Sequence, residues 1–318
     1  MYCFRLCVLL VSVSVAVYLL TPNIDQLWWT QHEDYSCFNQ TFKGVLLVIV
    51  FNYPHYSHIP LLKSLYNKAF PNMVFCGAAN SSRFEVETVK LYKGYFGYDC
   101  LTRAIERSVN YTGYLVMSDD ILLNFWNLPR EDVSRVWEGP RKPITVGVFE
   151  KARDWYWWKS RWGLQNCLKA LNETNYREGG GRLLRVLSSN DVVESNGGCH
   201  GGRSDIFYLP HKHANTFTRL AKIFRKHNVF IEIAVPTMLR MLEGASDIVR
   251  LEGVYLPGRA GSEPVMNSEH LWENYSPHIH FIHPIKLHYG LKSRENIFML
   301  NHFIRKKIEK FVNCSPPL

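Results

Sequence analysis

Hydrophobic runs alternate with amphipathic segments from residue 44 onward. Residues 44–51 (GVLLVIVF) form an unbroken, β-branched run, which is typical of a central parallel strand covered on both faces. Shorter apolar runs predict further strands at 73–78, 114–117, 144–149 and 205–209. Apolar positions at helical spacing predict helices at 59–70, 101–109, 216–226 and 229–242, the last of them interrupted at Pro236. This alternation predicts an α/β fold with a mostly parallel sheet flanked by helices.

The first twenty residues carry a different pattern. Residues 6–20 (LCVLLVSVSVAVYLL) contain no charge, which indicates a membrane-targeting segment. A cleaved signal peptide is the alternative, but no small-x-small cleavage site precedes Thr21. We therefore expect a signal-anchor helix at 6–20 with a cytosolic tail at 1–5, a stem at 21–43 and a luminal domain at 44–318.

Glycosylation acceptor triplets support luminal exposure. Asn-x-Ser/Thr occurs six times, at Asn39, Asn80, Asn110, Asn172, Asn274 and Asn313. One triplet arises easily by chance, but six of them in a chain with an N-terminal apolar segment indicate glycosylated surface positions. The expected location is the Golgi or endoplasmic reticulum membrane, with the single-pass type II orientation.

Cysteine usage agrees with an oxidising compartment. Beyond the anchor the cysteines are Cys37, Cys76, Cys100, Cys167, Cys199 and Cys314, and no pair of them has C-x-x-C spacing. That spacing disfavours a zinc or redox site and favours up to three disulfides, whose pairing stays open.

Composition and charge narrow the class of ligand. The chain has 318 residues, of which 47% are hydrophobic and 20% charged, and this excludes a disordered or coiled-coil protein. The net charge of +9 is spread along the chain rather than gathered in one run. It suits an anionic small molecule better than a nucleic acid.

An acidic pair follows the predicted strand at 114–117. Asp119 and Asp120 repel each other there, and a divalent cation or a bound cationic group is the usual reason to keep two such carboxylates together. Ligands of parallel sheets bind at the carboxyl ends of the strands, where Asn52 also lies. The alternative is structural, with either carboxylate starting a helix or a tight turn.

Histidines recur in residues 278–288 (HIHFIHPIKLH). The alternation predicts a strand with its histidines on one face. A zinc site built from two of them with Asp119 or Asp120 is a rival interpretation, although the spacing identifies no third ligand.

These features together resemble the Golgi-type nucleotide-sugar glycosyltransferases of the GT-A superfamily over about residues 44–290. The resemblance implies a nucleotide-sugar lobe at 44–150 followed by an acceptor lobe at 151–318. It also implies that Asp119 and Asp120 grip the nucleotide diphosphate, with Asp120 and His283 holding Mn²⁺ or Mg²⁺ and Lys286 meeting the β-phosphate. Ser118 stands where the first Asp of an Asp-x-Asp motif would be.

Glu232 is the expected catalytic base. Apolar residues flank it on both sides, which tends to raise the pKa of a carboxyl and suits deprotonation of an acceptor hydroxyl. Inverting members of the superfamily carry such a residue late in the chain. The alternative is a structural glutamate that caps the helix or pairs with Arg225 or Arg240.

Acceptor-binding residues are expected in the second half of the chain. Trp155 and Trp158 belong to an aromatic cluster that can stack on sugar rings, although filling the interior is an equal alternative for each ring. Asp205 follows the glycine-rich stretch 197–202, which we expect to form an acceptor-side loop.

The expected function is transfer of a sugar from a nucleotide diphosphate donor to a glycan or protein acceptor in the secretory pathway. Two alternatives from other classes stay open: a non-catalytic luminal glycan-binding protein and a metal-dependent hydrolase.

Overall fold

The computed structural model describes residues 41–107, 111–140, 155–177, 198–256, 268–288 and 290–312. Several expectations lie outside these residues: the tail, anchor and most of the stem, the strand at 144–149, the acceptor sites at Asn39, Asn110 and Asn313, and Cys37 and Cys314. Within the described ranges, no helix combines the length and the apolar character that a membrane span requires.

A mostly parallel sheet forms the centre of the domain. Its strands among the described residues are β1 (Val45–Phe51), β2 (Asn72–Gly77), β3 (Glu87–Thr88), β4 (Gly113–Ser118), β6 (Trp137–Glu138), β7 (Ile206–Pro210) and β8 (Val249–Arg250). The seven strands of this described sheet lie in the order β3-β2-β1-β4-β7-β6-β8. The neighbours in β3-β2-β1-β4 are parallel, whereas β7 is antiparallel to both β4 and β6. The predicted α/β class with a mostly parallel sheet is confirmed.

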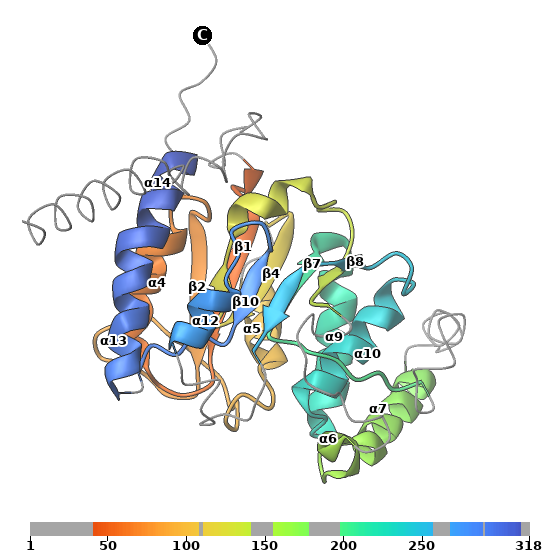
Figure 1. The fold of residues 1–318 in the computed structure, drawn as a ribbon. Helices are drawn as coiled ribbons and strands as arrows, with labels where there is room; N and C mark the ends of the chain where they lie inside the picture. The colour runs from red at the N-terminus through yellow and green to blue at the C-terminus, as the bar shows by residue number, and fades with distance from the viewer. Residues whose placement is uncertain are drawn as a thin grey trace, which may run out of the picture. The chain divides into compact units, whose positions relative to one another are not determined.

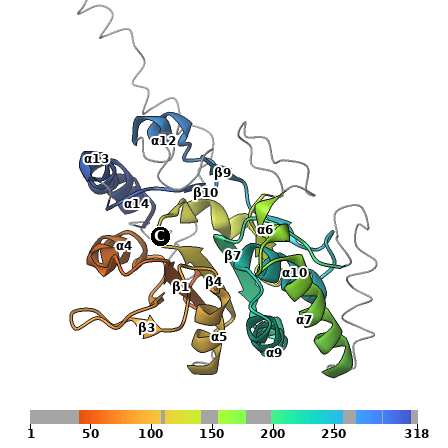
Figure 2. The same cartoon turned by 90° about the horizontal axis from the view of Figure 1, so that it is seen from below.

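Helices cover both faces of this sheet (Figures 1 and 2). The described helices are α4 (Ile59–Tyr66), α5 (Tyr98–Arg107), α6 (Tyr156–Lys159), α7 (Leu164–Arg177), α9 (Ala214–Lys226), α10 (Ile231–Leu242), α12 (Ser268–Asn274), α13 (Gly290–Met299) and α14 (Arg305–Val312). Helices α5 and α9 lie on one face, and α4, α13 and α14 lie on the other.

The central strand explains the two covered faces. All seven residues of β1 are buried, as its unbroken apolar run predicts. Leu46, Val48 and Val50 belong to the large apolar core that also contains side chains of α5, α9 and α10. The alternate β1 residues face the other side because successive side chains in a strand point to opposite faces.

A second, smaller sheet lies next to the carboxyl end of β4. Among the described residues it contains β5 (Leu122–Leu123), β9 (Gly253–Tyr255) and β10 (Phe281–His283) in the order β5-β10-β9. Strand β5 follows β4 after a short turn, so its pairing with β10 draws the C-terminal histidine segment toward the acidic pair.

The expectation of one strand through residues 278–288 is wrong, because β10 spans only three of them. Pro284 follows β10 directly and has no amide hydrogen to continue a ladder. The histidines also do not share a face. His280 Nε2 lies 3.1 Å from a Glu131 carboxylate oxygen, whereas His283 Nε2 lies 3.1 Å from Asp120 Oδ1.

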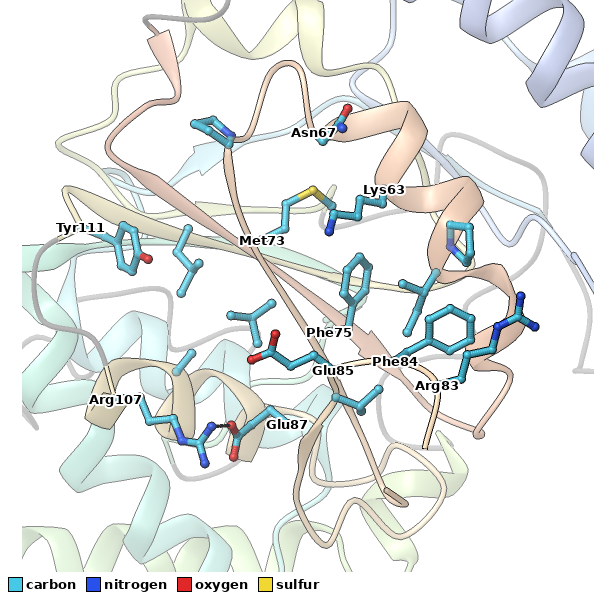
Figure 3. A pocket seen from close by; sticks show the side chains of 17 residues that line it. Lys63, Asn67, Met73, Phe75, Arg83, Phe84, Glu85, Glu87, Arg107 and Tyr111 are labelled. Carbon is cyan, nitrogen blue, oxygen red and sulfur yellow. Dashed lines mark ion pairs between the residues drawn. The ribbon is translucent and has the colours of Figure 1, made fainter. Parts of the chain in front are cut away.

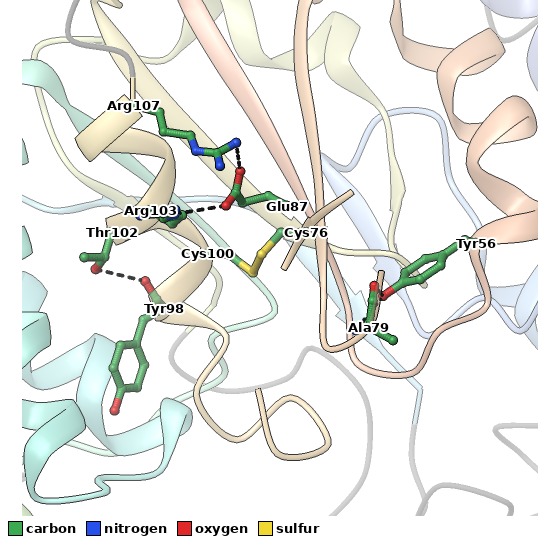
Figure 4. Close-up of a disulfide and its surroundings, with 9 residues drawn as sticks. All are labelled: Tyr56, Cys76, Ala79, Glu87, Tyr98, Cys100, Thr102, Arg103 and Arg107. Carbon is green, nitrogen blue, oxygen red and sulfur yellow. Dashed lines mark hydrogen bonds and ion pairs between the residues drawn. A yellow bond between two sulfur atoms is a disulfide. The ribbon is translucent and has the colours of Figure 1, made fainter. Parts of the chain in front are cut away.

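Two disulfides join elements within the described residues. Cys76–Cys100 links β2 to α5 beside Glu87, which pairs with Arg103 and Arg107 (Figure 4). Cys167–Cys199 links α7 to the loop that precedes β7. These bonds confirm disulfide use for four of the six cysteines that the sequence analysis named.

Helix α10 continues through Pro236, so the predicted interruption is wrong. Proline has no amide hydrogen, and its place in the helix leaves the Glu232 carbonyl without the usual i→i+4 donor. The Gly202 N–H donates to that carbonyl instead, at 2.9 Å. A loop outside the helix thus satisfies the freed backbone group.

Three acceptor triplets for glycosylation fall on described residues. The side chains of Asn80 and Asn172 are exposed, whereas Asn274 is half-buried. Asn274 also donates its side-chain amide to the His270 carbonyl at 2.8 Å. Asn80 and Asn172 are therefore more accessible for modification than Asn274.

Candidate functional site

The acidic pair lies in a tight turn at the carboxyl end of β4. Ile121 N–H donates to the Ser118 carbonyl at 3.2 Å and closes the turn. Asp119 N–H donates to the Val50 carbonyl of β1 at 3.0 Å, and the Asp120 carbonyl accepts from Ile285 N–H at 2.7 Å. The local backbone is therefore a tight turn, as the structural alternative for this pair proposed. The turn itself is held between β1 and the segment after β10.

Asp120 carries the best-compensated negative charge of the pair. Its carboxylate pairs with Lys286, and its Oδ1 lies 3.1 Å from His283 Nε2. Burial opposes ionisation of Asp120, but His283 and Lys286 outweigh it and hold the pKa of this carboxyl well below its usual range. Burial and the charge of Asp120 raise the pKa of Asp119 well above its usual value. Of the two, Asp120 is the carboxylate that stays ionised.

His283 connects the acidic pair to Asp205. Its Nε2 lies 3.5 Å from Asp205 Oδ1, on the side of the ring that also faces Asp120. Burial lowers the pKa of His283, but the charges of Asp205 and Asp120 more than reverse this and raise it overall. The Asp205 carbonyl accepts from Ser118 N–H at 2.8 Å, so the loop before β7 is fixed to the end of β4.

Glu232 lies in the first turn of α10, and its partner is Arg203. Arg203 Nη1 lies 3.6 Å from Glu232 Oε1. The structural alternative that pairs Glu232 with Arg225 or Arg240 is wrong, because each of these arginines binds another carboxylate. Arg225 binds Asp99 instead, because both face the space between α5 and α9.

Arg240 forms a buried, two-pronged ion pair with Glu138 of β6, at 3.1 and 2.7 Å. Arg250 of β8 contacts the same carboxylate. Arg240 and Glu138 are both buried, so the pair ties the C-terminal half of α10 to the sheet. Removing one partner would leave the other charge buried and uncompensated.

The carboxyl of Glu232 is poised to exchange a proton near neutral pH. The pKa of this carboxyl is raised to about 7, mainly by burial. The charge of Asp205 adds to the rise, whereas the charges of Arg203 and His283 oppose it. Only 15% of the side chain is exposed. A base with a pKa near the operating pH combines a large ionised fraction with a useful affinity for protons.

Arg203 and Tyr255 belong to the same cluster and were absent from the sequence predictions. The Arg203 guanidinium lies 5.1 Å from the centre of the Tyr255 ring. Burial opposes the charge of Arg203, yet Glu232, Asp205 and Tyr255 outweigh it and raise its pKa. The position of Arg203 two residues before Asp205 was an available signal, because residues two apart share one face of an extended segment.

Asn52 lies at the carboxyl end of β1, as predicted, and contacts the acidic pair through its backbone. A hydrogen bond from the Asn52 backbone partly offsets the rise in the pKa of Asp119. The Asn52 side chain packs against Gly94, where an added Cβ would lie 2.0 Å from Asn52 Oδ1. Asn52, Asp119, Asp120 and Lys286 are therefore neighbours, and the structure brings the four predicted donor residues together.

Trp155 and Trp158 lie around the glycine-rich loop. Their ring centroids are 5.6 Å apart in an edge-on arrangement, and a Cβ on Gly201 would lie 2.9 Å from both rings. Trp158 is buried, whereas Trp155 is half-buried. The interior-filling alternative therefore describes Trp158 well, and Trp155 keeps an accessible part of its ring.

The donor atoms at Asp120 suit a divalent cation. Among the described residues, no group of three or more His, Cys, Asp or Glu side chains is arranged to hold one ion alone. Asp120 and His283 nevertheless place a carboxylate and an imidazole nitrogen 3.1 Å apart. Mg²⁺ is often held by one or two protein ligands, with substrate phosphates completing the shell. Asp120 and His283 would fit an ion of that kind once Lys286 leaves the Asp120 carboxylate and His283 loses its proton.

A cavity of about 650 Å³ lies apart from these residues (Figure 3). Its wall is formed by side chains of β1, β2, α4, α5 and the loops before β3 and β4, among them Lys63, Met73, Phe75, Phe84 and Tyr111. None of the predicted site residues lines it. It lies on the β2 side of the sheet, so the volume of a cavity alone does not identify the candidate site.

Two curated relatives from Arabidopsis thaliana match this chain. "Probable glycosyltransferase STELLO2" is 23% identical over 201 residues, which cover 62% of this chain and 24% of the relative. "Probable glycosyltransferase STELLO1" is 23% identical over 248 residues, which cover 76% of this chain and 30% of the relative. The chain thus aligns with less than a third of the length of either protein.

The family model of the STELLO glycosyltransferases matches residues 16–179. The matched segment contains β1 to β4, Asn52 and the acidic pair at Asp119 and Asp120. It spans more than half of the 318 residues, and the chain therefore belongs to the STELLO glycosyltransferase family.

Proposed function

We propose that this chain transfers a sugar from a nucleotide diphosphate donor to a glycan or protein acceptor, as a glycosyltransferase of the GT-A type. One observation carries the proposal: His283, Asp205 and Arg203 connect the acidic pair to Glu232. The proposed diphosphate-binding end and the proposed base, a carboxyl with a pKa of about 7, would therefore share one site. Family membership supports the same reaction class.

In this proposal the donor lies at the carboxyl ends of β1 and β4. Lys286 meets the diphosphate as a point charge, and Asp119 and Asn52 face the nucleoside. The lobe at 44–150 then carries the donor, and the lobe at 151–318 carries the acceptor. Asp205 and the accessible part of Trp155 are the acceptor contacts, and Trp158 supports them from the interior.

Asp120 and His283 are the proposed ligands of a Mn²⁺ or Mg²⁺ ion. When bound, such an ion neutralises charge on the diphosphate leaving group. His283 must offer a neutral ring nitrogen for this role. Its raised pKa makes ion binding dependent on pH.

Glu232 is the proposed base. Its carboxylate removes the proton of the acceptor hydroxyl as that oxygen forms a bond to the anomeric carbon. The bond from the anomeric carbon to the diphosphate oxygen breaks, and its electron pair leaves with the nucleoside diphosphate. Attack opposite the leaving group inverts the anomeric centre, and Glu232 then releases its proton to solvent.

The proposed location is the Golgi or endoplasmic reticulum membrane. The uncharged segment 6–20 supports a signal anchor with residues 44–318 in the lumen. The described disulfides support an oxidising compartment. The proposed partners are the membrane, the nucleotide-sugar and the acceptor, without a nucleic acid.

Donor hydrolysis and transfer test the proposal. The purified full-length chain would be incubated with a panel of nucleotide-sugars and Mn²⁺, and release of nucleoside diphosphate would be measured with and without acceptor glycans. A transferase releases nucleoside diphosphate faster with acceptor, and Asp120→Asn abolishes the release. A glycan-binding protein releases none from any donor. A hydrolase releases it at a rate that acceptors do not change.

A further inference from the structure

An exposed group of tyrosines lies beside the proposed donor site. Tyr53, Tyr92 and Tyr156 expose 48%, 50% and 66% of their surfaces, and the half-buried Tyr95 lies among them. We call these four side chains the tyrosine platform. They come from three separate segments: the turn after β1, the loop before α5 and helix α6.

Ring contacts connect three of the four side chains: Tyr95 lies against Tyr92, and Tyr95 and Tyr156 both contact Trp157. The fourth, Tyr53, interacts with Tyr95 electrostatically. Burial raises the pKa of Tyr95, and the neighbouring phenols of Tyr156, Tyr92 and Tyr53 raise it further. The Tyr92 and Tyr95 rings have centroids 5.4 Å apart in an edge-on contact.

Tryptophans support the platform from behind. The Tyr95 ring packs edge-on against Trp157 and Trp162, with centroids 5.1 and 5.0 Å apart. Trp157 in turn stacks on Phe230 at 3.9 Å, directly before α10. The Tyr95 ring is therefore held in place before any ligand binds, which lowers the entropy cost of binding.

The backbone of the platform is held in an unusual conformation. Tyr92 and Lys93 have φ values of 47° and 59°, and Gly94 follows with φ 86°. A left-handed conformation is unfavourable for a residue other than glycine and persists only where the surrounding structure determines it. Here the loop packs between Asn52 on one side and α10 on the other.

The platform adjoins both ends of the proposed reaction. Gly94 contacts the side chain of Asn52, which belongs to the donor end. The Tyr95 carbonyl accepts from Ile231 N–H at 2.9 Å, one residue before the proposed base Glu232. A ligand lying on the tyrosines thus lies next to the position where the acceptor hydroxyl must approach.

We propose that the tyrosine platform binds the sugar rings of an acceptor oligosaccharide beyond the ring that reacts. Exposed ring faces stack on the C–H faces of pyranoses, and the phenol hydroxyls offer hydrogen bonds to sugar hydroxyls. Arg161 lies over Trp162 and donates to the Tyr92 hydroxyl at 3.4 Å, which adds a polar rim. This inference rests on the proposed function and names its acceptor class as an oligosaccharide rather than a single amino-acid hydroxyl.

A set of matched variants tests the platform. Tyr53→Ala combined with Tyr156→Ala removes two exposed rings, of which Tyr156 lies edge-on to Trp157 with centroids 5.1 Å apart. Tyr53→Phe combined with Tyr156→Phe keeps the rings and removes only the hydroxyls. Tyr176→Ala is the control, because Tyr176 is 90% exposed and belongs to α7 rather than to the platform.

Binding of chitohexaose, maltohexaose and mannohexaose to the full-length chain would be measured by ligand-observed nuclear magnetic resonance. We expect at least one of them to bind and the double alanine variant to weaken its Kd about tenfold, as the loss of two stacked rings implies. The double phenylalanine variant should lose less than threefold, and Tyr176→Ala should bind like the unmodified chain.

Two results would overturn the inference: none of the three oligosaccharides binds, or the double alanine variant binds as well as the Tyr176→Ala control. Donor hydrolysis measured on the same preparations separates this failure from failure of the proposed function. Hydrolysis without oligosaccharide binding would contradict the platform but not the proposed transferase activity. Binding that depends on the platform, without hydrolysis, would support the platform and contradict the proposed transferase activity.

Discussion

The backbone N–H of Gly202 donates to the carbonyl oxygen of Glu232 at 2.9 Å. This bond exists because Pro236 has no amide hydrogen to offer to that carbonyl. The loop that carries Arg203 and Asp205 is thereby attached to the first turn of α10 by its backbone. The proline thus determines how the base and its partners are placed, although it lies outside the site.

Replacing Pro236 with alanine tests this attachment. Pro236→Ala restores the helical N–H, which competes with Gly202 for the Glu232 carbonyl. We expect the melting temperature to stay within a few degrees, because alanine favours helix while one contact to Gly202 is lost. Turnover should fall about fivefold or more, since small displacements of positioning groups are costly for catalysis.

The control for that variant is Thr237→Ser, which keeps the hydroxyl that holds an earlier part of the same loop. Thr237 Oγ1 accepts from His200 N–H at 2.9 Å. Turnover of Pro236→Ala equal to that of Thr237→Ser would show that the Gly202 contact does not position the base.

Replacing Glu232 with glutamine tests the proposed base. The variant keeps the shape but accepts no proton, so turnover should fall about 100- to 10,000-fold while donor affinity stays within twofold. Glu252→Gln, at an exposed position, is the matched control. Turnover of Glu232→Gln within a few-fold of the unmodified chain would remove Glu232 from the mechanism and move the search to Asp205.

The pH dependence follows from the raised pKa of Glu232, about 7 in place of 4.5. At saturating Mn²⁺, the ratio kcat/KM should rise about tenfold per pH unit below 7 and level off above it, because only the ionised carboxylate acts as a base. The sign for stability is opposite: ionising Glu232 is harder in the folded chain, so its contribution becomes unfavourable as the pH rises from 4.5 to 7. At pH 8, Glu232→Gln should therefore unfold at equal or higher urea concentration than the unmodified chain.

Much of the fold was predictable because its dominant signals are local. The continuous apolar run of β1 predicts burial on both faces, and the helical spacing in α4, α5 and α9 needs no tertiary information. The predicted interruption of the helix at Pro236 was wrong, because a distant loop supplies the missing hydrogen bond. The predicted strand through the histidine segment was also wrong, because Pro284 ends the strand after His283.

In the candidate site, too, local signals were predictable and long-range contacts were not. Asp119 and Asp120 stand out in the sequence because two carboxylates follow a buried strand. The partner of Glu232 was missed because Arg203 comes from a loop whose position depends on β7 and α10. The contribution of Tyr92 was missed because nothing local predicts a left-handed conformation for it.

Replacing Asp120 with asparagine tests the donor site. Removing the charge should abolish nucleotide-dependent thermal stabilisation and lower turnover at least about 100-fold. The fold should persist at lower stability: the change removes the ion pairs of Asp120 with Lys286 and His283, but it also relieves the repulsion that raises the pKa of Asp119, which can then ionise. Asp247→Asn is the control, since Asp247 forms an exposed ion pair with Arg135 at 3.3 Å. A variant that is unfolded without ligand would show that Asp120 is structural.

Secretion tests the proposed topology. A chain that starts at about residue 22 behind a cleavable signal peptide should leave the cell in soluble form, because segment 6–20 is the proposed membrane element. Asn80 and Asn172 are exposed, so Asn80→Gln and Asn172→Gln should each increase the gel mobility of the secreted protein by one glycan. Asn274→Gln should shift it less completely, because its side-chain amide donates to the His270 carbonyl. Retention in carbonate-washed membranes would contradict the single anchor, and mobility that glycosidase treatment leaves unchanged would contradict exposure to the lumen.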